Sequence, residues 1–98
     1  MNFVQIIEFS TTREADVDAL LDQWLERTRG KRTATRGVQT RDRERANTYV
    51  QIIEFPSYED AVTNSELSET SEVAAHLAEL CDEPPTFRNL DVTRDMTM

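Results

Sequence analysis

The stretch "FVQIIEF" at residues 3–9 returns almost unchanged as "YVQIIEF" at residues 49–55. In both copies the side chains alternate between two faces, which predicts two β-strands. Both faces of each copy are largely apolar, so both are expected to be covered. We assign the face that carries the aromatic residues, the glutamine and the second isoleucine to the helices.

A helix is predicted after the first copy, between residues 11 and 30. Thr11 and Glu14 have the spacing of a capping box, and Gly30 stands where a helix commonly ends. Apolar and small residues recur at helical spacing along it: Val17, Leu20, Leu21, Trp24 and Thr28.

The second copy precedes a helix that is predicted to form in two pieces. Ser57 is placed to cap a short helix that runs to about Asn64, and a break follows within "SELSE" at residues 65–69. The proline pair in "EPP" at residues 83–85 ends the second piece. That piece carries an apolar stripe: Val73, Leu77, Leu80 and Cys81.

Each half of the chain closes with a further predicted strand, at residues 32–40 and 86–95. The resulting βαββαβ order is that of the ferredoxin-like α+β fold, and 98 residues predict a single domain, 1–98. Right-handed crossovers place the two repeated strands side by side in the centre of an antiparallel four-stranded sheet, with strand order 4-1-3-2.

The sheet face away from the helices predicts a homodimer. Each buried aliphatic side chain contributes about 1.5–3 kcal/mol, and a large exposed apolar patch is unusual on a monomer. We expect a second copy to cover this face about a two-fold axis, as a dimeric α+β barrel. Arg36 is expected to pair with Glu8 or Glu54 near that face. The aliphatic residues concerned are Val4, Ile6, Val50, Ile52, Leu90 and Val92.

Composition excludes several classes of function. A net charge of −8 argues against general nucleic-acid or membrane-surface binding, although eight of the eleven basic residues lie in the segment 27–45. That segment is interpreted as a charged, solvated edge or as the contact for an anionic ligand or an acidic partner. One histidine and one cysteine predict no zinc site, and two glycines make no phosphate-binding loop.

No apolar run is long enough to span a membrane, and the polar start of the chain does not look like a signal peptide. Cys81 is the only cysteine, so no internal disulfide can form. A reducing cytoplasm is the expected location.

The element order and "YVQIIEFPSYEDAV" at residues 49–62, followed by a broken helix, resemble the antibiotic biosynthesis monooxygenase-like group of the dimeric α+β barrel superfamily. The resemblance covers about residues 2–95. It implies a ligand cavity between sheet and helices in each subunit. Members of the group include cofactor-independent quinone-forming oxygenases and haem-degrading enzymes.

The resemblance carries over few site residues. Where many relatives have a histidine in the first piece of the second helix, this chain has Asn64. His76 lies near the position of the axial histidine of haem-degrading members, but their first-strand asparagine matches Gln5 or Ile7 here. Their tryptophan on the second helix is absent, since the sole tryptophan is Trp24. These departures disfavour haem, and we expect no cofactor and no metal.

Two kinds of side chain are candidates for a site. His76, the only histidine, is a candidate catalytic base, or simply a partly buried helix residue with a satisfied hydrogen bond. Trp24 forms the wall of a pocket for a planar ligand or belongs to the core. Gln5 and Gln51 lie within apolar strands, so their amides hydrogen-bond to each other or to a ligand.

Two further candidate substrate-binding residues flank the short helix. Tyr58 offers a phenol at its start and Asn64 lies at the break, although a packing residue and a helix end account for them equally well.

Three functions follow from these observations. The first is a homodimeric pocket protein that acts as a cofactor-independent monooxygenase on a planar aromatic or polyketide-like small molecule. The alternative is a non-catalytic homodimeric module that binds a metabolite or a protein partner through the arginine-rich segment. A haem-binding protein that uses His76 is the least favoured.

Overall fold

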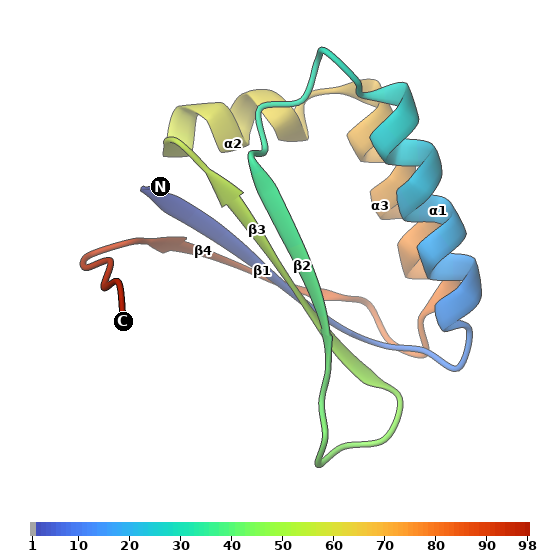
Figure 1. Ribbon diagram of the computed structural model, residues 1–98. Coiled ribbons are helices and arrows are strands. Elements are labelled where there is room, and N and C mark those ends of the chain that lie inside the picture. The colour runs from blue at the N-terminus through green and yellow to red at the C-terminus, as the bar shows by residue number, and fades with distance from the viewer. Residues whose placement is uncertain (1) are drawn as a thin grey trace.

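The computed structural model describes residues 2–98 and has one four-stranded sheet with helices on one face (Figure 1). All strand pairs are antiparallel, in the order β2-β3-β1-β4. This is the predicted order 4-1-3-2 taken from the other edge, so the ferredoxin-like prediction is confirmed. The elements are β1 (Phe3–Ser10), α1 (Glu14–Arg27), β2 (Arg36–Arg41), β3 (Thr48–Phe55), α2 (Tyr58–Ser65), α3 (Ser68–Leu80) and β4 (Thr86–Asp91).

The repeated strands β1 and β3 pair with each other through the centre of the sheet. Phe3 lies opposite Phe55, and Phe9 lies opposite Tyr49 with the two rings stacked 5.5 Å apart. All four rings are buried on the side of the helices. Phe9 and Tyr49 form the core together with Val17 of α1 and with Leu77 of α3. The predicted face assignment is therefore confirmed.

The opposite face of the sheet carries aliphatic side chains that the helices do not cover. Ile52 lies at its centre, opposite Ile6 on one side and Val38 on the other, and all three are half-buried. Leu90 on β4 is 43% exposed. Ion pairs border this face: Arg36 contacts Glu54, as predicted, and Arg45 contacts Glu8, each at 3.2 Å.

The start of α1 differs from the prediction. Arg13 is the N-cap and its side chain makes no capping hydrogen bond, so the capping box is wrong. Thr11 is fully buried and its hydroxyl donates to the carbonyl oxygen of Leu80, at 2.6 Å. The hydroxyl thus ties the β1–α1 connection to the end of α3. Gly30 follows the C-cap Thr28 by two residues with φ 79°, a conformation that favours glycine.

The outer strands are shorter than predicted. β2 begins at Arg36 rather than at residue 32, because Thr33 bonds to α2 instead of to the sheet: its hydroxyl donates to the carbonyl oxygen of Asp60. β4 ends at Asp91 rather than at residue 95.

The two-piece helix after β3 is confirmed. The Ser57 hydroxyl accepts a hydrogen bond from the Asp60 amide at 3.1 Å, and the break falls at residues 66–67. Among residues 2–98, no helix is long and apolar enough to cross a membrane.

Candidate functional site

A cavity of about 330 Å³ lies between the second half of α1, the segment at residues 32–35, and strands β2 and β3. This volume falls within the range of about 300–1,000 Å³ that is usual for small-molecule sites. Its wall is mostly apolar and carries a few polar groups, as ligand sites do. Its lining includes Leu21, Trp24, Arg32, Gln39, Gln51 and Ile53.

A chain of hydrogen bonds orients the amides on the sheet side of the cavity. Gln51, which is 4% exposed, donates to Oε1 of Gln39 at 2.9 Å, and Gln39 donates to Oδ1 of Asp18 on α1 at 3.0 Å. An ionised carboxylate only accepts hydrogen bonds. Asp18 therefore holds the Gln39 oxygen towards Gln51. The second N–H of Gln51 takes no part in this series of hydrogen bonds.

Gln5 and Gln51 do not bond to each other. Gln5 lies opposite Asn89 and donates to its Oδ1 at 3.3 Å, whereas Gln51 lies opposite Gln39. Gln5 and Gln51 instead line a second cavity of about 90 Å³, which shares Leu21 and Gln51 with the larger one. Gln51 thus stands where the two cavities adjoin.

Sequence reasoning missed Gln39. Its only signal is the strand register, since the residue opposite a buried glutamine is a natural partner for its amide. The predicted strand 32–40 includes Gln39, but its pairing partner depends on the β2–β3 turn.

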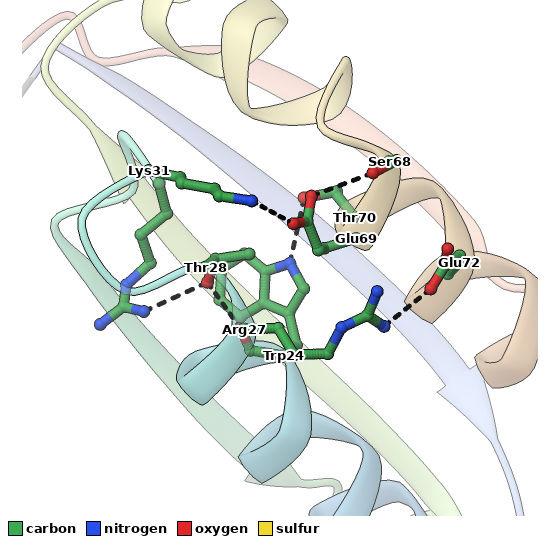
Figure 2. Close-up of polar contacts among 9 residues, drawn as sticks. Trp24, Arg27, Thr28, Lys31, Ser68, Glu69, Thr70 and Glu72 are labelled. Atoms are coloured by element: carbon green, nitrogen blue, oxygen red, sulfur yellow. Dashed lines mark hydrogen bonds and ion pairs between the residues drawn. The ribbon is translucent and has the colours of Figure 1, made fainter.

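Trp24 is half-buried between α1 and α3, outside the core cluster around Phe9 and Tyr49. Its indole N–H donates to the Thr70 hydroxyl on α3 at 3.0 Å, so it ties the two helices together (Figure 2). The same half-buried side chain lines the larger cavity. The guanidinium of Arg32 lies 5.7 Å from the centre of its ring, within the range of a cation–π contact.

The other three sequence candidates lie elsewhere. His76 is exposed on α3 and lines a separate pocket of about 80 Å³ beside Arg27. Tyr58 is 56% exposed and meets Phe3 edge-on, at 5.5 Å. Asn64 is buried, and its Oδ1 accepts a hydrogen bond from the Thr33 amide at 3.3 Å. None of the three lines the larger cavity.

The arginine-rich segment is largely neutralised by the fold. Six of its eight basic side chains form ion pairs with carboxylates. Within residues 2–98, only Arg32 and Arg43 of this segment form no ion pair. In the same part of the chain, no group of three His, Cys, Asp or Glu side chains is arranged to hold a metal ion.

Two ion pairs join α1 and its following turn to α3, on either side of Trp24 (Figure 2). Lys31 contacts Glu69 at 2.6 Å and Arg27 contacts Glu72 at 2.7 Å. The hydrogen bond from the Lys31 ammonium lowers the pKa of Glu69 from 4.5 to about 2.

Acid is expected to weaken the contact between α1 and α3 through Glu69. Because its pKa is about 2 in the folded chain and near 4.5 when unfolded, the unfolded state takes up the proton first. The stabilisation is therefore complete above pH 4.5 and is lost as the pH falls towards 2. As the pH is lowered from 4.5 towards 2, the Tm of Glu69→Gln should fall less than the Tm of the unchanged chain. Glu72→Gln is the matched control, and parallel curves for Glu69→Gln and the unchanged chain would contradict the assignment.

Comparison with known proteins identifies the fold. No protein-family model and no curated protein sequence matches the chain. Among solved structures, a protein of Nitrosomonas europaea assigned to the antibiotic biosynthesis monooxygenases superposes with a TM-score of 0.76 at 14% identity, over 94% of this chain and 90% of its own. A similarly assigned protein of Deinococcus radiodurans gives 0.78 at 12% identity, over 98% and 97%.

A third similar structure is SnoaB, a cofactor-independent oxygenase from Streptomyces nogalater. It superposes with a TM-score of 0.75 at 15% identity, over 99% of this chain and 96% of its own. The chain therefore has the fold of the antibiotic biosynthesis monooxygenase-like group, as the resemblance of residues 49–62 predicts.

Proposed function

We propose that the chain binds a planar aromatic or polyketide-like small molecule in the larger cavity and oxidises it with O₂, without a bound cofactor. The observation that carries the proposal is the cavity of about 330 Å³ with Trp24 on one wall and the anchored amide of Gln51 on another. A similar fold in SnoaB, described as a cofactor-independent oxygenase, supports the chemistry.

The protein's part in this reaction is to bind, orient and exclude water. The substrate ring lies against the apolar wall at Trp24, and the spare N–H of Gln51 donates to a phenolic oxygen. A hydrogen bond from an amide that is already held in place by Gln39 stabilises the phenolate. The phenolate supplies the electrons: for an anthrone, the methylene carbon loses two hydrogens, one oxygen atom of O₂ becomes the new carbonyl oxygen, and the other leaves as water.

His76 makes no contact with the substrate in this arrangement, because His76 is exposed beside a different pocket. We also propose that the functional unit is a homodimer in which a second copy covers the open face of the sheet. The half-buried aliphatic cluster around Ile52, bordered by ion pairs, supports this arrangement.

Gln51→Leu is expected to weaken the binding of a dihydroxyanthrone roughly fivefold to tenfold, the effect of one lost hydrogen bond in a buried site. Trp24 is the only tryptophan, so quenching of its fluorescence reports occupancy directly. An oxygen electrode then follows turnover in the same samples.

His76→Ala is the comparison variant, and its affinity and oxygen uptake are expected to stay within about twofold of the unchanged chain. A steep loss of oxygen uptake in His76→Ala would instead make His76 the base. Unchanged binding in Gln51→Leu would remove Gln51 from the site.

One observation fits the non-catalytic alternative, in which the cavity binds a small molecule without oxidising it. Among residues 2–98, the ionisable side chains on the cavity wall are Arg32 and Arg36, and no carboxylate or histidine of this part of the chain lines it. A cavity without a base suits binding as well as it suits oxidation of a substrate that ionises by itself. Fluorescence quenching by the anthrone with no oxygen uptake above the protein-free rate would support the alternative.

A further inference from the structure

Arg32 differs from the other seven basic residues of the segment 27–45. It alone of the eight is half-buried, and it lines the larger cavity. Its Nη1 donates to the carbonyl oxygen of Leu25 at 2.8 Å and to the hydroxyl of Thr28 at 3.2 Å. Together with the contact to Trp24, these bonds hold the guanidinium in place.

The charge of Arg32 has no counter-ion within residues 2–98. Its neighbour on the cavity wall, Arg36, is paired with Glu54 at 3.2 Å. The partners of Arg32 are a carbonyl, a hydroxyl and an aromatic ring, none of which is ionised. A guanidinium carries five N–H donors, so Arg32 retains donors after binding Leu25 and Thr28 through Nη1.

Because the chain has a net negative charge, the binding of an anionic ligand depends on a local cation such as Arg32. At −8, the long-range field repels an anionic ligand. A fixed cation without a counter-ion on the cavity wall opposes that repulsion locally, and a guanidinium matches the planar geometry of a carboxylate.

We propose that Arg32 is an anion-recognition residue and that the ligand is an aromatic molecule carrying a carboxylate. This inference rests on the proposed function, since it uses the same cavity. The inference specifies in addition that the substrate is anionic. Its ring lies against the apolar wall, and its anionic group meets Arg32 at the cavity rim.

The test compares two probes of the same shape, anthraquinone-2-carboxylate and anthraquinone-2-carboxamide, by quenching of Trp24 fluorescence. The carboxylate is expected to bind the unchanged chain about tenfold more tightly, the effect of one charge-assisted hydrogen bond. Arg32→Gln should reduce that ratio to about one. Arg32→Lys should keep most of it.

Arg43→Gln is the matched control, because Arg43 is an exposed arginine on the β2–β3 connection that forms no ion pair within residues 2–98 and does not line the cavity. Arg43→Gln is expected to bind the carboxylate about tenfold more tightly than the carboxamide, as the unchanged chain does. Using a ratio within each variant removes any general effect of the substitution on the fluorescence of Trp24.

The outcomes separate this inference from the proposed function. Equal binding of the two probes to the unchanged chain overturns the anion preference and leaves the cavity proposal standing. A ratio that persists in Arg32→Gln, or that is lost in Arg43→Gln, overturns the assignment to Arg32. Binding of neither probe overturns the inference together with the proposed aromatic site.

Discussion

Replacing Phe55 by alanine is expected to lower the free energy of unfolding by about 3–5 kcal/mol, the usual cost of deleting a buried aromatic ring. Phe55 is 2% exposed at the end of β3, and its ring lies 6.3 Å from that of Phe3. A domain of this size has a net stability of about 5–15 kcal/mol, so the loss is a large share of the total. Thermal unfolding should show a Tm lower by more than about 12 °C.

Phe87→Ala is the control for this effect. Phe87 lies on the same face of the sheet, on edge strand β4, but is 47% exposed. Its removal should cost less than about half as much, because it leaves a smaller cavity and forfeits less burial. Equal losses for the two variants would contradict the placement of the core along β1 and β3.

Replacing Ile52 by aspartate is expected to convert the proposed dimer into a monomer. Ile52 lies at the centre of the open face, between Ile6 and Val38 in the strand register. A carboxylate there would be buried between two sheets without a partner, which costs several kcal/mol per charge, and a two-fold axis would place two such charges in one interface.

Light scattering at micromolar concentration measures the outcome. The unchanged chain should give twice the chain mass of 11.3 kDa, and Ile52→Asp should give the chain mass itself. Met96→Asp, at a 57% exposed apolar side chain of the C-terminal tail, should remain dimeric. A monomer for the unchanged chain contradicts the dimer, and a dimeric Ile52→Asp places the interface on another surface.

Local signals predicted most of the elements but not the places where segments distant in sequence meet. The alternation in both repeats and the Ser57 cap are local, and the structure confirms them. Thr11 has the spacing of a capping residue, yet its hydroxyl donates a hydrogen bond to the carbonyl oxygen of Leu80, 69 residues away. The start of β2 shifted for the same reason, because Thr33 finds its hydrogen bonds on α2.

The same distinction between local signals and contacts of distant segments applies to the residues of the candidate site. Trp24 and Gln51 could be selected from sequence because a large aromatic and a buried amide are conspicuous at positions with a clear period. Gln39 and Asp18 could not be selected, because they acquire their role only from the β2–β3 register and the approach of α1. The environments of Trp24 and His76 also depend on how α1 and α3 pack, which no local pattern specifies.

By itself, the sequence determined which strands and helices form, their order and the face that each repeated strand turns to the core, but not where α1 and the outer strands begin and end. Those properties follow from side-chain periodicity and from right-handed crossovers, which act along the chain or on the whole topology. Only the tertiary structure decided that Gln51 bonds to Gln39, that Arg32 forms no ion pair within residues 2–98 and that His76 lies outside the cavity. Hydrogen bonds and ion pairs act over a few ångströms, so their partners depend on the three-dimensional proximity of residues that are remote in the sequence.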